Sequence, residues 1–156
     1  MSEWLHITGN IRLITRDVNS KNELKKLRNA IGKKIGHVQS YLSNLESTKL
    51  PSGSEGSLEW SLTNDEQFMP SSPNVHSLQN VSLTIHGNLR DVSSLEELED
   101  WLNNTVTNAT FAEKPHLGGI DFGVVSAVFD DYDKMTNYNF MNGVWKKSTV
   151  DFSEED

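Results

Sequence analysis

The chain has 156 residues, of which 35% are hydrophobic and 23% charged, and its formal net charge is −8 at pH 7; this profile predicts one globular domain with a sizeable core. It contains no cysteine, which excludes disulfides, thiol nucleophiles and thiolate-bound metals. We find no signal-peptide pattern and no apolar stretch near the ~20 residues that span a bilayer, so we expect a cytoplasmic protein without a membrane role.

The first predicted element is a strand near the N-terminus. Leu5, Ile7, Ile11 and Leu13 alternate with polar residues, which is the two-residue period of a half-buried strand. Gly9 falls on the apolar phase of this strand, where glycine indicates a bulge or the close approach of a helix backbone.

A helix follows, and it concentrates the positive charge of the chain. Ser20 and Glu23 form a capping-box pattern at its start, ahead of an apolar stripe that runs from Leu24 to Ile35. Residues 1–50 hold nine Lys and Arg against four Asp and Glu, whereas the rest of the chain holds five against eighteen. A solvated helix face is the usual explanation of such a basic run, and the acidic remainder argues against nucleic-acid binding. The basic residues are Lys21, Lys25, Lys26, Arg28, Lys33 and Lys34.

A glycine-rich segment precedes the second predicted strand, in which Leu58, Trp60 and Leu62 alternate with polar residues. The segment could nest an anion with its backbone N–H groups. It lacks the Lys-Ser/Thr ending of a phosphate-binding loop and leads into a strand, so a tight turn is the better interpretation. Its residues are Gly53, Ser54, Glu55 and Gly56.

The same order of elements then recurs. After a Pro- and Ser-containing loop over residues 65–80, Leu83–Arg90 lines up with Leu5–Arg12, and Asp91–Leu98 lines up with Asp17–Leu24. Ser94 and Glu97 repeat the capping box, and Ile120 to Phe129 forms a dense apolar run typical of a well-buried strand. We therefore predict an internal duplication, with repeat one over about residues 3–64 and repeat two over about 80–131.

Strand–helix–strand twice over predicts an α+β fold, a ferredoxin-like βαββαβ sandwich with a four-stranded antiparallel sheet and both helices on one face. In that topology the first and third strands are central neighbours. Asn142-Gly143 lies between aromatic and β-branched residues and predicts a separate C-terminal hairpin over about residues 136–150. The prediction is one ferredoxin-like domain over residues 1–150, with residues 151–156 as an acidic tail.

Three stretches of the chain resemble a widespread family of small uncharacterised proteins of tailed bacteriophages. They are Trp4-Leu5-His6-Ile7-Thr8-Gly9 with Ile11-Arg12, Leu50-Pro51-Ser52-Gly53-Ser54-Glu55-Gly56-Ser57-Leu58, and Gly87-Asn88-Leu89-Arg90-Asp91. The resemblance implies a phage-encoded accessory protein made in the cytoplasm of the infected bacterial host. It implies no activity and no catalytic residues.

The polar phases of the two central strands predict the candidate site. If the apolar phases face the helices, the open face of the sheet carries Trp4, His6, Thr8, Asn10, Arg12, Thr84, His86, Asn88 and Arg90. His-x-Thr in the first strand resembles the motif of two-histidine phosphoesterases, where one imidazole is the general base and the other the general acid. The second strand has the reverse order, Thr-x-His, so the motif is complete only once. This departure favours the interpretation that these are ordinary polar residues on a sheet face that is open to solvent or covered by a partner.

Metal binding has little support in the sequence. Asp130, Asp131 and Asp133 could ligate a hard cation. The segment lacks the glycine at the sixth position of an EF-hand loop, however, and Met141 occupies the twelfth position, where an EF-hand has glutamate. A solvated acidic strand end is the simpler explanation. We expect no metal and no cofactor.

Two functional hypotheses remain. The first is a non-enzymatic accessory protein that binds, and in doing so inhibits, a host or phage protein. The second is a phosphodiesterase or nucleotide-binding protein that uses His6, Thr8, Thr84 and His86 as its catalytic or binding set. An open sheet face also suits a homodimer.

Overall fold

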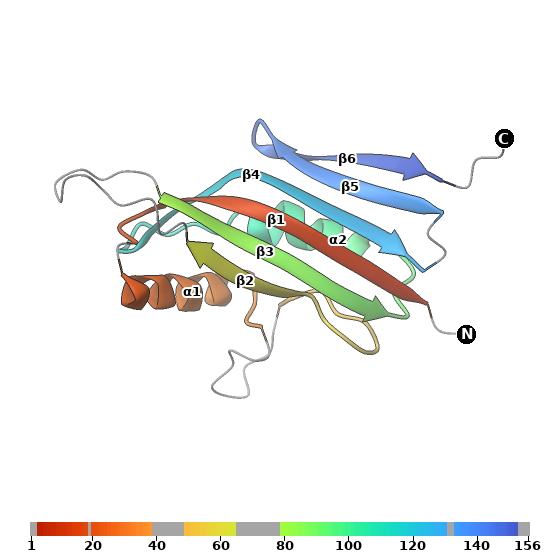
Figure 1. Cartoon of the computed structure of the whole chain (residues 1–156), viewed down its shortest axis with the longest axis horizontal. Helices are drawn as coiled ribbons and strands as arrows, with labels where there is room; N and C mark the ends of the chain where they lie inside the picture. Colours follow the sequence, from red (N-terminus) through yellow and green to blue (C-terminus); the bar gives the residue numbers. More distant parts are fainter. Residues whose placement is uncertain (1–2, 19, 39–48, 65–78, 131–132, 153–156) are drawn as a thin grey trace.

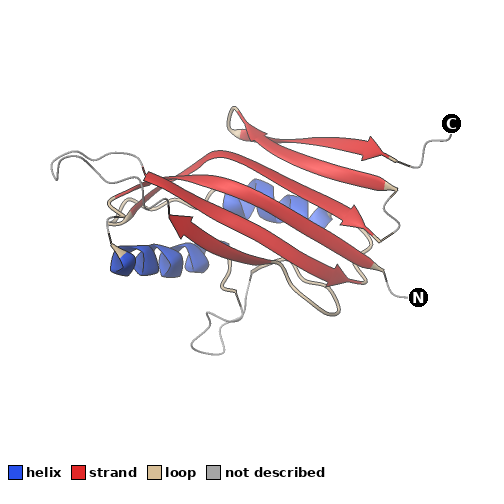
Figure 2. Cartoon of the chain, in the orientation of Figure 1, coloured by secondary structure: helices blue, strands red, loops and turns tan. Residues whose placement is uncertain are grey.

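The computed structural model describes residues 3–18, 20–38, 49–64, 79–130 and 133–152. These residues form an α+β fold in which one six-stranded antiparallel sheet carries its helices on one face (Figures 1 and 2). Along the chain the elements are β1 (Trp4–Arg16), α1 (Lys21–Ile35), β2 (Glu59–Asn64), β3 (Gln79–Arg90), α2 (Glu96–Asp100), the π-helical turn η2 (Trp101–Val106), β4 (His116–Phe129), β5 (Lys134–Met141) and β6 (Val144–Asp151).

The sheet has the strand order β2-β3-β1-β4-β5-β6, and every pair of neighbours is antiparallel. The expected central pairing of β1 with β3 is confirmed. The expected size of the sheet is wrong, because the C-terminal hairpin does not stand apart. Its strand β5 pairs with β4 from Gly123 to Val128, so β5 and β6 extend the same sheet to six strands.

The core lies between the sheet and the helices. On β1 and β3 the apolar phase is buried as expected, with Leu5, Ile7, Ile11, Leu83 and Ile85 each 1% exposed or less. These side chains pack with apolar residues of α1, α2 and η2 in one cluster. Burial of these apolar side chains is the main favourable contribution to folding.

The glycines on the apolar phase of β1 and β3 allow neighbouring strands to approach, whereas the sequence suggested a bulge or the close approach of a helix backbone. A Cβ on Gly9 would lie 2.7 Å from the Val124 carbonyl oxygen of β4. A Cβ on Gly87 would lie 2.9 Å from the Leu58 Cα, just before β2. Glycine at these two positions therefore permits close contact between backbones.

The two helices begin differently. The Glu23 N–H donates to the Ser20 hydroxyl at 3.2 Å, so Ser20 is the N-cap of α1 as expected. The equivalent capping box does not form in α2, whose N-cap is Leu95. The Glu97 carboxylate accepts instead from the Ser52 N–H at 3.2 Å, because this distant backbone group competes for it. The helix then widens into η2, where the Trp101 indole N–H donates to the Ile35 carbonyl at 2.8 Å.

The C-terminal hairpin forms at the predicted turn. Asn142 and Gly143 have φ values of 52° and 83° and connect the facing residues Met141 and Val144, which is the geometry that Asn-Gly favours between twisted strands. Trp145 at the start of β6 is half-buried. Its indole N–H donates to the Thr107 hydroxyl at 3.1 Å, so the start of β6 is tied to the helix layer.

The expected inter-repeat loop at residues 65–80 and the acidic tail at 151–156 lie mostly outside the described residues. Asp151 itself belongs to β6. Within the described ranges, no helix is long and apolar enough to cross a membrane.

Candidate functional site on the open sheet face

The side chains predicted for the open face of the sheet do lie on the face away from the helices. On β1 and β3 they alternate with the buried apolar residues, and all are exposed or half-buried. The register places Thr8 opposite His86, His6 opposite Asn88 and Asn10 opposite Thr84. Thr8 and His86 are also aligned positions of the two similar sequence stretches, so those stretches face each other about this central pair.

His6 is held on both sides of its ring. Its Nδ1 lies 2.6 Å from Oδ1 of Asn88, and its Nε2 lies 2.6 Å from Oδ1 of Asp130 at the end of β4. Both nitrogens face oxygen acceptors, an arrangement that favours the doubly protonated imidazolium. The hydrogen bond to Asp130, and then that to Asn88, raises the pKa of His6 above its ordinary value. The same hydrogen bond lowers the pKa of Asp130.

His86 has different surroundings. Its side chain is 56% exposed, and its Nε2 lies 3.6 Å from a carboxylate oxygen of Glu59 on β2. The two histidines are therefore not equivalent, because one is bound between two acceptors and the other extends into solvent. Both ring nitrogens of His6 already bind groups of the fold, so neither is placed to accept a proton from a substrate.

The arginines of the predicted site also have neighbours within the fold. The Arg90 guanidinium donates to Glu55 Oε1 at 2.7 Å and lies 3.8 Å from Asp91 Oδ2. The Arg12 guanidinium lies over the Phe122 ring, 5.6 Å from its centroid, at a distance suited to a cation–π contact. These contacts favour structural roles for both arginines over phosphate binding.

The glycine-rich segment is a turn docked against the end of β3. The Ser54 N–H donates to the Arg90 carbonyl at 2.8 Å, and the Arg90 N–H donates to the Glu55 carbonyl at 3.0 Å. A Cβ on Gly56, whose φ is 77°, would lie 2.1 Å from the Asn88 carbonyl oxygen. Because these backbone groups bind β3, the turn interpretation is favoured over an anion nest. Trp4 starts β1 at this same end, where its N–H donates to Asp130 Oδ2 at 3.0 Å.

Sequence reasoning missed an apolar strip on the same face. We define the apolar strip as Phe122 and Val124 of β4, Met141 at the end of β5, and Val144 and Val150 of β6. Their exposed fractions are 48%, 45%, 52%, 54% and 42%. The register places Val124 between Asn10 and Asn139, and Met141 opposite Val144, on the face that carries His6 and Thr8.

The signal that could have found the strip was present in the sequence. Ile120–Phe129 is apolar in both phases of its alternation, and this run predicted a well-buried strand. No helix among the described residues covers its second face (Figure 2). A strand that is apolar on both faces in a sheet with helices on one side is the pattern of an exposed apolar surface.

Asp130 is a partner of His6, and Asp131 lies outside the described residues. Within the described ranges, no three His, Asp or Glu side chains come together as metal ligands would.

Comparison of the chain with protein-family models, with curated proteins and with solved structures gave no match.

Proposed function

We propose that this chain is a phage-encoded accessory protein that works in the cytoplasm of the infected bacterium by binding, and thereby inhibiting, another protein. The sequence resemblance to small phage proteins supports the setting. The observation that carries the binding role is the apolar strip, whose five side chains lie on the sheet face that no helix of the described part of the chain covers. Exposed apolar surface of this kind is typical of interaction sites.

The scaffold for this role is a ferredoxin-like unit with an added hairpin. The order β2-β3-β1-β4 and the helices that connect β1 to β2 and β3 to β4 support this assignment. The pairing of Thr8 with His86, which are aligned residues of the two similar stretches, supports an internal duplication. The hairpin widens the open face on the β4 side, and most of the apolar strip lies at or near it.

The chemistry around the apolar strip indicates the kind of partner. Arg12 stacks on Phe122, and the register places Lys146 on the open face beside Asn139. Three carboxylates on this face already have basic partners within the fold, since Glu59 lies beside His86, Asp130 binds His6 and Glu55 binds Arg90. A partner segment with apolar side chains flanked by carboxylates would match this surface. A second copy of the chain offers cations against cations at the strip, so we favour a different protein over a homodimer.

The test is a pull-down of the tagged chain from infected host lysate, with nuclease treatment and mass spectrometry. We expect one protein in stoichiometric amount with the natural chain, and its loss with the double variant Val124→Ser and Met141→Ser. A matched variant in the helix layer, Lys21→Ser with Lys25→Ser, should capture it as well as the natural chain does. Equal capture by the strip variant would overturn the proposed surface, and recovery of the chain alone would overturn the binding role.

The alternative role is a phosphodiesterase or nucleotide-binding protein that uses His6, Thr8, Thr84 and His86. It has less support, because both ring nitrogens of His6 are hydrogen bonded. The double variant His6→Ala and His86→Ala separates the two hypotheses. It would abolish hydrolysis or binding of nucleotides at this face and leave strip-dependent capture of a protein largely intact.

A further inference from the structure

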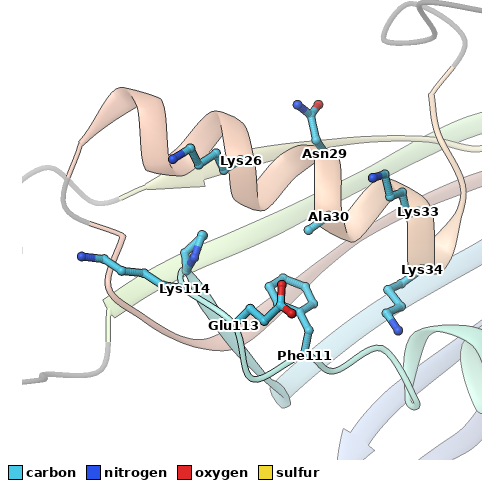
Figure 3. Close-up of a pocket in the computed structure, with 9 residues that line it drawn as sticks. Lys26, Asn29, Ala30, Lys33, Lys34, Phe111, Glu113 and Lys114 are labelled. Carbon is cyan, nitrogen blue, oxygen red and sulfur yellow. The ribbon is translucent and has the colours of Figure 1, made fainter.

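A basic cleft lies in the helix layer, away from the open sheet face. It has a volume of about 360 Å³ and opens between α1 and the segment that leads into β4 (Figure 3). Its α1 residues follow helical spacing and therefore share one side of the helix. The residues that line it are Lys26, Asn29, Ala30, Lys33 and Lys34 from α1, and Phe111, Glu113, Lys114 and Pro115 from the facing segment.

The charge of the cleft is opposite to that of the whole chain. Four of its nine lining residues are lysines and one is a glutamate, whereas the chain carries a net charge of −8. Among the described residues, no carboxylate lies within ion-pair distance of Lys26, Lys33 or Lys34, whereas Lys114 of the same cleft lies 3.9 Å from Glu23. By contrast, Lys147 lies 2.9 Å from Glu99 in the hairpin. Like charges on one helix side repel each other, and a bound anion would relieve that repulsion.

The wall opposite α1 is apolar and held in place by the backbone. Phe111 is half-buried, and its N–H and carbonyl exchange hydrogen bonds with Leu117 at 2.9 and 3.0 Å. Pro115 and Ala30 add apolar surface, and Glu113 lines the cleft from the same segment as Phe111 (Figure 3). An aromatic ring offers a surface on which a planar group can stack, and a carboxylate in the same cleft can accept hydrogen bonds from hydroxyl or amino groups.

We propose that this cleft binds a nucleoside phosphate, with the phosphate groups among the lysines of α1 and the base against Phe111. The volume falls within the range of small-molecule sites. Lysine ammoniums on flexible stems suit phosphate as point charges. Glu113 faces the hydroxyl groups of the sugar or the amino group of the base. Inorganic phosphate alone would leave the apolar wall uncovered and would meet the charge of Glu113 without compensation.

The first experiment is calorimetric titration of the full chain at ~100 mM salt, where exposed charges are largely screened beyond ~10 Å. The probes are ATP, pyrophosphate, adenosine and a short oligonucleotide with a 5′-phosphate. We expect ATP to bind saturably, and more tightly than either pyrophosphate or adenosine. Comparison of ATP with the oligonucleotide distinguishes a free nucleotide from a strand end as the source of the ligand. Absence of saturable binding by both ATP and the oligonucleotide, or pyrophosphate binding as tight as that of ATP, would overturn the proposal.

Matched variants locate the site. Lys33→Gln with Lys34→Gln removes two charges inside the cleft, and Lys21→Gln with Lys25→Gln removes two charges from α1 outside it. We expect the first pair to weaken ATP binding about tenfold or more, as expected for the loss of two charge-assisted contacts, and the second pair to change it much less. Equal weakening by both pairs would show a diffuse charge effect and overturn the assignment. The variant His6→Ala with His86→Ala should leave ATP binding at the cleft unchanged, and loss of binding there would place the ligand on the sheet face instead.

Discussion

The two halves of the open sheet face differ in the contacts and the exposure of their side chains. On β1 and β3 two of the basic side chains are bound within the fold, His6 by Asp130 and Arg90 by Glu55. On β4, β5 and β6 large apolar side chains such as Phe122 and Met141 stay about half exposed. In the half that resembles a catalytic motif, the histidine of the complete His-x-Thr pair is thus already hydrogen bonded within the fold. The half without any motif carries the surface that a partner would stabilise most, because covering it removes apolar area from water.

A similar contrast distinguishes two turns at the edges of the sheet, one of which is packed against a strand while the other is not. Gly56 and Gly143 both have positive φ values, 77° and 83°. A Cβ on Gly56 would lie 2.1 Å from the Asn88 carbonyl oxygen, whereas a Cβ on Gly143 would meet nothing within 4 Å. The glycine-rich turn is therefore packed into the fold, and the hairpin turn extends into solvent.

The largest expected effect is a loss of stability, and it tests the difference between the two glycine turns. Gly56→Ala combines backbone strain with overlap against β3 and should lower the free energy of unfolding by about 2–4 kcal/mol. Gly143→Ala brings the strain alone and should cost about 1 kcal/mol. Chemical denaturation of the two variants beside the natural chain measures both values. Similar losses in the two variants would mean that the glycine-rich turn moves away from Asn88 at little cost.

The next effect concerns how the hairpin is attached to the helix layer. The Tyr138 hydroxyl donates to Glu99 Oε2 at 2.8 Å, and the Lys147 ammonium lies 2.9 Å from the same oxygen. Burial and the adjacent Glu99 raise the pKa of Tyr138, and the contact with Lys147 lowers the pKa of Glu99. Glu99→Gln should cost about 1–2 kcal/mol and speed amide hydrogen exchange in β5 and β6 more than in β1 and β3.

The pH dependence of this attachment has a definite sign. Because the folded-state pKa of Glu99 is lowered, its contribution is present above the unfolded value of about 4.3 and is lost as pH falls through the folded value. Acidification should therefore remove the difference between Glu99→Gln and the natural chain. The control is Lys146→Gln on the opposite face of β6, which should leave exchange in the hairpin unchanged. Uniform acceleration across the sheet would contradict a local role for Glu99.

Local patterns predicted the parts of this molecule that depend on neighbouring residues. The alternation in β1 and β3, the Ser20 cap and the Asn142-Gly143 turn each depend on a few adjacent side chains, and each formed as expected. The pairing of the two central strands followed from the order of the elements.

The parts that failed depend on competition between distant groups. Glu97 leaves its capping position because its carboxylate accepts a hydrogen bond from the Ser52 N–H, 45 residues away. The burial pattern of β4 could not be predicted from its composition, since an apolar run does not reveal which faces are covered. The Asp130 contact of His6 joins residues 124 positions apart, so the motif on β1 gave no sign that its histidine was already bound.

A smaller effect tests the polar half directly. Asp130→Asn removes the carboxylate that raises the pKa of His6, so the titration of His6 followed by NMR should shift to lower pH. A raised folded-state pKa contributes stability that is fully present below the unfolded value of about 6.5 and is lost as pH rises through the folded value. The variant should thus lose more stability at pH 6 than at pH 9. Glu59→Gln, beside the other histidine, should leave the His6 titration where it is. An unchanged titration in Asp130→Asn would mean that this pair does not persist in solution.

The smallest expected effect sharpens the contrast between the two halves. Val124→Ser with Met141→Ser replaces apolar side chains that are 45% and 52% exposed, so the free energy of unfolding should stay within about 0.5 kcal/mol of the natural value. Thermal and chemical unfolding check this, with Ile7→Ala in the core as the reference, where a loss of about 2–5 kcal/mol is expected. A strip that contributes nothing to folding and is needed for capture of a partner has binding as its remaining role. If the double variant instead loses more than about 1 kcal/mol, these side chains pack within the fold, and the binding surface must be sought elsewhere on the sheet.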